Sequence, residues 1–347
     1  MNKKGTSNIT KLLILICILL VLVILTLCIG KYPISIKDSF SIITRAITFR
    51  PQIADEMSVN VVLKLRLPRI LVSIFVGAAL SISGACYQGI YKNPLVSPDF
   101  LGVSSGACIG AAIAILLNLT KGYISILAFC GGIIAVLITM IIPSLIKNKS
   151  NIMLVLSGII VGALMSSILG FIKYVADPYT ELASITYWTM GSFSYASIED
   201  LLPMVLVMLP PTIILIIMSW WIDVLSMGDD EAKTLGANTK LVKTITIICS
   251  TLLTSGAICF AGTIGWVGLI VPHVSRLLVG SSNRRVIPCS CLVGAIFMLL
   301  VDTATRTIGI TEMPVSIMTG IIGAPFFCYL LYKKRNEIIW WRIKLKI

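Results

Sequence analysis

The sequence predicts an all-α polytopic membrane protein with about ten transmembrane helices. Of its 347 residues, 57% are hydrophobic and only 12% are charged, and the mean hydropathy is +0.99. Soluble domains carry about 25% charged residues, and disordered chains require low hydrophobicity, so both classes are excluded. Apolar runs of about 20 residues, the length that crosses a bilayer, recur along the whole chain.

The apolar runs predict ten spans in one membrane domain covering residues 1–347. The first run is expected to remain as a span, because it is too long for a signal peptide and no small-residue cleavage site follows it. A glycine-rich turn at 261–265 must serve as the whole loop between the seventh and eighth spans. The predicted spans are 12–30, 69–90, 100–119, 123–146, 152–175, 201–225, 241–261, 264–280, 286–304 and 313–332.

The spans divide into two blocks of four, 69–175 and 241–332, on either side of the sixth span. An odd number of crossings separates the starts of the blocks, which gives them opposite topology. This predicts inverted-repeat-like halves, an arrangement common in transporters. Segment 226–240 and a basic tail at 333–347 are predicted to lie in the cytoplasm.

The net charge of +13 is explained by an excess of basic residues on one side of the membrane. With the N-terminus inside, the cytoplasmic segments contain 18 of the 28 basic residues but only 6 of the 15 acidic residues. Cytoplasmic loops are enriched in Lys and Arg, so the pattern predicts a multi-pass protein of the plasma or inner membrane with both termini cytoplasmic. Membrane lipid surrounds it, and no nucleic-acid partner is needed to explain the charge.

Three arginines are predicted at the outer surface. Arg66 and Arg69 flank Pro68 at the expected start of the second span, where cations oppose the helix dipole. This disadvantage indicates either an external use, such as pairing with carboxylates of another protein, or a headgroup anchor. Arg306 follows Asp302 by four residues, a spacing that lets the two side chains pair on a helix.

Two cytoplasmic segments contain further signals. Pro94 and Pro98 break the chain after the second span, and Asp99 is placed to cap the third span. After the sixth span, acidic residues are followed by Ala232 and then by Gly236. This order predicts a short capped helix outside the bilayer, either a docking surface for a cytoplasmic partner or an ordinary solvated loop.

No catalytic or metal site is predicted. The chain lacks a phosphate-binding G-x-x-x-x-G-K-[ST] loop and the common hydrolase and zinc motifs. His273, the single histidine, is either a proton relay or ligand within a span or a packed histidine.

These segments together resemble one family, the FecCD/cobalamin-type permease of type II ABC importers for ferric siderophores, haem and cobalamin. The resemblance covers nearly the whole chain from about residue 64. It rests on Arg66-Leu-Pro-Arg69, Gly77-Ala-Ala-Leu, Ser83-Gly84-Ala, Gln88-Gly89, Asn93-Pro-Leu, Leu101-Gly102-Val-Ser-Ser-Gly106, Trp188 with Met190-Gly191-Ser192, Leu225 to Gly236, Gly265 to His273, and Leu299 to Phe326.

The resemblance implies a type II ABC importer fold and a set of partners. These are a second permease subunit, identical or paralogous, a cytoplasmic ATPase dimer and an extracellular substrate-binding protein or lipoprotein. No cofactor is expected on this chain, because ATP and Mg belong to the partner ATPase. The chain is accordingly expected to be a transport subunit and not an enzyme, with a cavity at the dimer axis lined chiefly by the fifth and tenth spans.

The resemblance also implies roles for individual residues. Arg66, Arg69 and Arg306 match arginines that meet acidic residues of the binding protein. The ATPase coupling segment matches Gly228, Asp229, Asp230, Glu231, Ala232, Leu235 and Gly236. The gates match Asn93, Leu95, Ser150, Asn151 and Ile152. Asn151 and Ile152 depart from the small hydroxyl residues of the cobalamin permease, which weakens a cobalamin assignment.

The predicted function is import of an iron chelate, most simply a ferric siderophore. A haem or cobalamin importer of the same family is the nearest alternative. An ion-coupled secondary transporter and a membrane scaffold without transport are alternatives of other classes.

Overall fold

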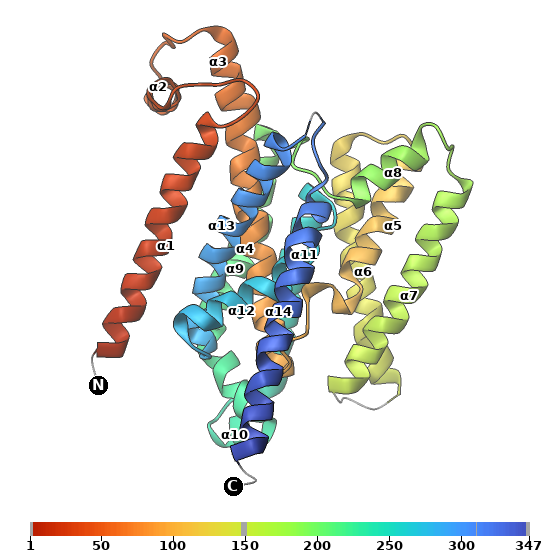
Figure 1. Cartoon of the computed structure of the whole chain (residues 1–347). Coiled ribbons are helices and arrows are strands. Elements are labelled where there is room, and N and C mark those ends of the chain that lie inside the picture. Colours follow the sequence, from red (N-terminus) through yellow and green to blue (C-terminus); the bar gives the residue numbers. More distant parts are fainter. Residues whose placement is uncertain (1–2, 147–150, 310, 345–347) are drawn as a thin grey trace.

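The computed structural model describes residues 3–146, 151–309 and 311–344, and this part of the chain contains helices and no strand. The ten helices that match the predicted spans run side by side (Figure 1). Both termini lie at the end that carries α10, and α2, α3 and α8 lie at the opposite end. We call these the α10 end and the α8 end; their assignment to the inside and outside of the membrane stays a prediction.

The ten predicted spans correspond to ten helices. They are α1 (Lys3–Cys28), α4 (Leu67–Tyr91), α5 (Val103–Leu116), α6 (Lys121–Leu145), α7 (Asn151–Val175), α9 (Leu201–Met227), α11 (Thr239–Ala261), α12 (Val267–Val279), α13 (Asn283–Thr307) and α14 (Val315–Lys344). The shorter elements are α2 (Ile36–Ile47), α3 (Glu56–Asn60), η1 (Val61–Arg66), η2 (Pro98–Leu101), α8 (Glu181–Thr189), η3 (Ile198–Asp200) and α10 (Asp229–Thr234).

Not all ten helices are equally long. Within the described residues, seven are long and apolar enough to cross a membrane, whereas 103–116, 267–279 and 315–330 are shorter apolar stretches. At about 1.5 Å per residue, the 13 residues of α12 extend about 20 Å, less than the ~30 Å hydrocarbon core. The predicted third and eighth spans were therefore too long, because glycine-containing turns occupy their first residues. Conversely, α14 continues to Lys344, well into the predicted tail.

The second span begins earlier than predicted. The helix runs without a break from Glu56 through a π-helical segment, Val61–Arg66, into α4. Arg66 and Arg69 thus lie well inside a helix, and the positive end of its dipole is at Glu56. The predicted conflict between these arginines and the dipole is wrong for this reason. The cap predicted for the third span is also wrong, since Gly102 is the N-cap of α5 and Asp99 instead accepts a hydrogen bond from the hydroxyl of Ser104.

Helix α4 occupies the centre of the molecule and is buried along most of its length. It packs against α9, α11, α12 and α13. Small residues make this packing possible: a Cβ on Gly77 would lie 2.2 Å from the carbonyl oxygen of Gly294 in α13, and one on Gly84 would lie 1.9 Å from that of Gly268 in α12. Such close backbone approach is typical of helix pairs in membranes.

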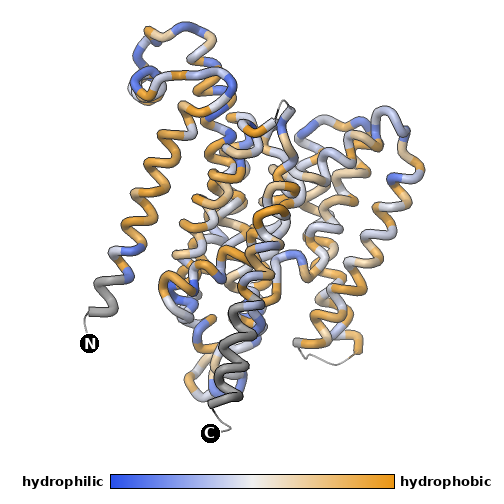
Figure 2. The backbone as a smooth tube through the Cα atoms, viewed as in Figure 1, coloured by the Kyte–Doolittle hydropathy of each residue, from blue (hydrophilic) through white to orange (hydrophobic). Residues whose placement is uncertain are grey.

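The outer helices expose apolar surface. Helices α6 and α7, and α1 from Leu12 onward, are mainly hydrophobic, and hydrophilic residues gather around α2, α3 and α10 (Figure 2). Because lipid tails solvate apolar side chains, this distribution fits a membrane-embedded chain. Helix α7 from Ile152 to Phe171 contains no charged residue and exposes Ile159, Ile160 and Leu164.

Candidate functional site

The first candidate site is a buried arginine–carboxylate cluster at the α8 end, formed by Arg69, Asp302, Arg306 and Glu312. Arg69 donates from Nε to Oδ1 of Asp302 over 2.7 Å. Its Nη1 lies 2.9 and 2.8 Å from the two carboxylate oxygens of Glu312. The cluster joins α4 and α13 to the loop that precedes α14, and its two positive charges balance two negative charges.

Arg306 completes the cluster. Its Nε lies 3.9 Å from Oδ2 of Asp302, which confirms the predicted pairing as an ion pair without a hydrogen bond. Its Nη2 donates to the carbonyl oxygen of Thr26 over 2.7 Å. Asp302 is fully buried, so its charge depends on these two guanidinium groups, because an unpaired buried carboxylate is very costly.

Arg66 binds the C-terminal end of α1. Its Nη1 donates to the carbonyl oxygens of Leu27 and Cys28 over 2.6 and 3.2 Å, and its Nη2 donates to the carbonyl oxygen of Tyr32. The last carbonyl groups of a helix have no intrahelical partner, and cations at this end are favoured by the dipole. Arg66 and Arg306 together therefore hold the end of α1 against the rest of the molecule.

The predicted exposure of the three arginines is wrong. Arg66, Arg69 and Arg306 are 5%, 8% and 7% exposed, because backbone carbonyl groups and carboxylates of this chain surround them. The spacing of residues along the sequence cannot reveal such partners, because they lie on other elements: 34 to 39 positions away for Arg66 and more than 230 for Arg69. Whether these arginines also meet a binding protein stays a prediction.

Glu312 is the accessible member of the cluster, with 38% of its side chain exposed. It also accepts a hydrogen bond from the hydroxyl of Ser194, in the segment after α8. Burial alone would raise the pKa of Glu312, but the hydrogen bonds from Ser194 and Arg69 and the charge of Arg69 outweigh it and lower that pKa below its usual value. Glu312 is therefore ionised at neutral pH.

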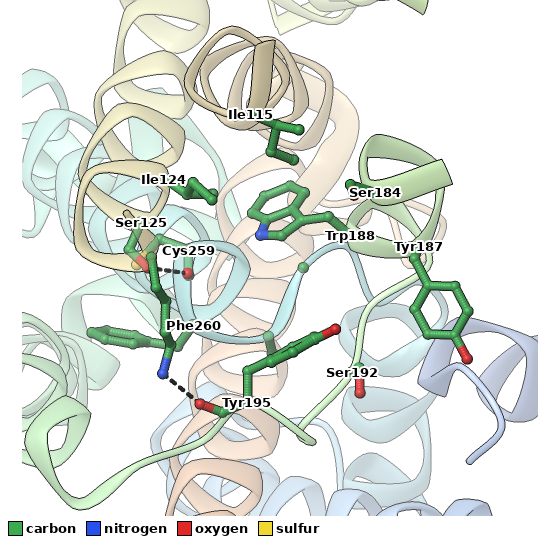
Figure 3. Close-up of a pocket in the computed structure, with 13 residues that line it drawn as sticks. Ile115, Ile124, Ser125, Ser184, Tyr187, Trp188, Ser192, Tyr195, Cys259 and Phe260 are labelled. Carbon is green, nitrogen blue, oxygen red and sulfur yellow. Dashed lines mark hydrogen bonds between the residues drawn. The ribbon is translucent and has the colours of Figure 1, made fainter. Parts of the chain in front are cut away.

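A cavity of about 260 Å³ opens nearby, between α8 and the adjacent ends of α5, α6 and α11 (Figure 3). The indole of Trp188 points into it toward Ile115, and Tyr187 and Tyr195 lie at its edge. Lys121 closes one side: its Nζ donates to the carbonyl oxygen of Tyr195. The lining is mainly apolar and aromatic, which suits an apolar side chain or ring better than an ion.

Of these cavity residues, the sequence patterns identified Trp188, Ser192, Ala261 and Gly262, and only as parts of a motif or of the turn at 261–265. The missed signal is compositional, since Tyr187, Trp188 and Tyr195 fall in a short segment between two spans. Helix α8 is connected to the cluster by the Tyr187 hydroxyl, which lies 3.4 Å from the carbonyl oxygen of Glu312. Lys121 also forms an ion pair with Asp200 at 2.5 Å.

The predicted short helix in the coupling segment is confirmed as α10. Gly228 precedes it, three acidic residues form its first turn, and Gly236 ends it with φ +82°. The N–H groups of Ala237 and Gly236 donate to the carbonyl oxygens of Ala232 and Lys233, both over 2.9 Å, which is the Schellman arrangement of a helix end.

Helix α10 packs against the spans and is joined to them by an ion pair. Ala232 is fully buried, so the helix packs into the core through its smallest side chain. Asp229 pairs with Lys243 of α11 at 2.7 Å, and Asp230 pairs with Lys233 at 3.0 Å. Leu235 is 55% exposed, which leaves an apolar side chain on the outward side of an acidic helix.

Of the predicted gate residues, Asn93 and Leu95 lie in the turn after α4 and Ile152 lies in the first turn of α7, both at the α10 end (Figure 1). The side-chain oxygen of Asn93 accepts from the N–H of Leu95 over 2.9 Å, which orders the turn after α4. Leu95 is exposed, and so is Ile152 in the first turn of α7. Ser150 and the side chain of Asn151 lie outside the described residues. The gate assignment stays a prediction.

Comparisons with known proteins agree on one type of transporter. Residues 18–333 match the FecCD transport family. The molybdate import system permease protein MolB of Haemophilus influenzae is 37% identical over 321 residues, 92% of this chain and 94% of MolB. The probable iron chelatin transport system permease protein of Helicobacter pylori strain 26695 is 39% identical over 276 residues, 80% of this chain and 83% of that protein.

A solved structure is also similar. It is described as an inward-facing conformation of a metal-chelate type ABC transporter. Its chain is 37% identical in sequence, with a TM-score of 0.84, and the match covers 93% of this chain and 99% of that chain. The similarity therefore extends over the whole helical architecture described above.

Proposed function

Because this chain belongs to the FecCD transport family and is the permease subunit of an ABC importer, we propose that it imports an iron chelate, most simply a ferric siderophore. A permease of this class does not hydrolyse ATP itself, so the proposal includes a partner ATPase dimer, a second permease subunit and an extracellular binding protein. Family membership leaves the ion-coupled secondary transporter and the scaffold without support.

The absence of charged residues from most of α7 and α14 favours a chelate as the substrate. These helices are the fifth and tenth spans, expected to line the cavity at the dimer axis. From Ile152 to Phe171 and from Val315 to Tyr332 neither helix contains a charged residue. A bulky chelate presents an organic shell that such walls tolerate, whereas a small oxyanion is usually held by cations or oriented N–H donors. The iron chelatin permease of Helicobacter pylori supports the same choice.

Molybdate is a second candidate, favoured by the 37% identity to MolB over 92% of this chain. Haem and cobalamin remain alternatives within the family. The deciding experiment reconstitutes this permease in proteoliposomes with its ATPase and binding protein, and compares uptake of ferric siderophores, haem, cobalamin and molybdate. We expect ATP-dependent uptake of the ferric siderophore. Uptake of molybdate alone would contradict the proposed substrate, and uptake without the ATPase would contradict the proposed mechanism.

We propose that α10 transmits movement from the ATPase. Its support is the burial of Ala232 and the Asp229–Lys243 pair, since a coupling element must move together with the spans behind it. Replacing residues 231–235 with a flexible linker should abolish substrate-stimulated ATP hydrolysis in the assembled complex. Unchanged stimulation would remove α10 from the coupling pathway.

We propose that the binding protein docks at the α8 end. The three arginines are covered in the single chain, so docking has to act through the surface around Glu312 or displace that carboxylate from Arg69. Combining Arg66→Glu with Arg69→Glu should prevent association of the binding protein, whereas Lys64→Glu, an exposed change on the same helix, is the control for general surface charge. Unchanged association of the double variant would refute the docking role, and thermal stability of both variants separates it from unfolding.

A further inference from the structure

A second, polar pocket of about 250 Å³ lies at the α10 end. Residues from the C-terminal ends of α4 and α9, from α12 and from the start of α13 line it. No step of the proposed transport cycle uses it. The polar residues that line it are Gln88, Lys92, Ser226, Arg276, Ser281 and Asn283.

The pocket has a positive charge that no lining residue balances. Arg276 donates to the side-chain oxygen of Gln88, whose amide nitrogen lies 3.4 Å from the carbonyl oxygens of Val96 and Leu269. This arrangement positions the guanidinium group but leaves its charge without a counterion. In the described part of the chain, neither Arg276 nor Lys92 forms an ion pair with a carboxylate.

The carboxylate of the neighbouring Asp223 already accepts three hydrogen bonds. It accepts from the Ser282 hydroxyl over 2.5 Å and from the backbone N–H groups of Asn283 and Arg284. Asp223 thereby fills the anion position at the start of α13. The pocket is a separate site beside this helix end.

Asn283 lacks a partner inside the pocket. The residue is 4% exposed, and within the described part of the chain its Oδ1 has no hydrogen-bond partner. A buried acceptor without a donor is unfavourable, so a ligand that supplies a hydroxyl hydrogen would satisfy it. A ligand that fits the pocket therefore carries a negative charge, which pairs with Arg276 and Lys92, and a hydroxyl group, which donates to Asn283.

We propose that this pocket binds a phosphate group that carries hydroxyl groups, either the headgroup of an anionic phospholipid such as phosphatidylglycerol or a free phosphate. Arg276 and Lys92 bind the phosphoryl oxygens, and a hydroxyl group donates to Asn283 Oδ1. Basic pockets between spanning helices at the cytoplasmic side suit such headgroups. The pocket adjoins Ser226, two residues before the N-cap of α10, so an occupant would contact the segment that leads into the coupling helix. This inference does not depend on which substrate is imported.

The test uses the full-length chain in nanodiscs, with two arms that separate the sources. In phosphatidylcholine nanodiscs, inorganic phosphate and glycerol 1-phosphate are titrated by calorimetry. In the other arm, native mass spectrometry measures retention of phosphatidylglycerol from mixed nanodiscs. We expect saturable binding in at least one arm, and the arm that responds identifies the source.

Three variants remove distinct parts of the site, and each should weaken that binding at least tenfold. Arg276→Gln removes the half-buried charge, and Asn283→Asp introduces a repelling charge without a change of size. Lys92→Asn removes an exposed charge at a residue with φ +52°, where Asn is well tolerated, so this variant tests the site even if the buried variants fail to fold. Lys240→Gln is the matched control, because it removes an exposed charge of the same end outside the pocket.

Two results would overturn the proposal. One is the absence of saturable binding by the wild-type chain in both arms. The other is an equal loss of binding in Lys240→Gln and Lys92→Asn, which would indicate general attraction of anions to a basic surface.

Discussion

At the scale of single residues, the structure gives Arg66, Arg69 and Arg306 contacts within the chain itself. Arg66 and Arg306 satisfy carbonyl groups at the end of α1, and Arg69 neutralises two carboxylates. Each has a structural function in the single chain, whatever it does in the complex. The 302/306 pairing was predictable because it is local on one helix, but the Arg69 contacts were not, since they join residues more than 230 positions apart.

Replacing Arg69 with methionine should destabilise the chain strongly. The buried Asp302 would lose the hydrogen bond that its Oδ1 accepts from Arg69 Nε, and breaking a buried pair in this way costs about 3–5 kcal/mol. The free energy of unfolding in mixed detergent micelles measures the effect. Adding Asp302→Asn should recover part of the loss, because it removes the uncompensated charge. A cost of Arg69→Met below about 1 kcal/mol, the value of an exposed pair, would contradict a structural role.

The Glu312 contacts should make stability depend on pH. Because the folded-state pKa of Glu312 is lowered, its contribution is fully present above the unfolded pKa of about 4.3 and is lost as the pH falls through the folded value. Glu312→Gln should therefore lower the melting temperature at pH 7, and the difference from wild type should shrink as the pH falls below about 4.3 and vanish only below the folded-state pKa. A difference that persists unchanged at low pH would show that ionisation of Glu312 is not the cause.

At the scale of elements, helix packing depends on a few glycines with no room for a side chain. A Cβ on Gly77 would meet the backbone of α13, whereas Gly170 in α7 has no atom within 4 Å of its Cβ position. Gly77→Ala should therefore lower stability by about 1–3 kcal/mol, the usual cost of overpacking. Gly170→Ala is the matched control and should be neutral or stabilising by up to about 1 kcal/mol. Equal effects of the two changes on thermal stability would contradict the close α4–α13 packing.

The end of α10 depends on a left-handed residue. At φ +82°, Gly236→Ala should cost about 1–2 kcal/mol of local conformational energy and should reduce substrate-stimulated ATP hydrolysis in the assembled complex. Gly236→Asn, which tolerates this conformation better, should retain more activity. If the alanine variant matched wild type, the geometry of this helix end would not matter for coupling.

At the scale of the whole molecule, the arrangement of charge predicts its orientation in the membrane. Exposed Tyr179 lies in the α7–α8 connection at the α8 end, and exposed Lys240 lies at the α10 end. Tyr179→Cys should therefore react with a membrane-impermeant maleimide in intact cells, and Lys240→Cys only after permeabilisation. The chain without an added cysteine measures the background from its ten native thiols. The reverse pattern would invert the predicted topology.

The sequence by itself determined the class of protein, the ten helices and the short helix α10. These depend on local patterns: apolar length, charge sidedness, and glycine or acidic residues at helix ends. Only the tertiary structure decided which spans are short, that α4 continues a helix begun at Glu56, and that the arginines are covered. Those outcomes arise from contacts between distant segments. Carbonyl groups of α1 bind Arg66 and Arg306, and Asp302 of α13 pairs with Arg69 of α4. The pocket around Arg276 and Asn283 was likewise decided only by the tertiary structure. Four helices form it, and no sequence pattern relates them to one another.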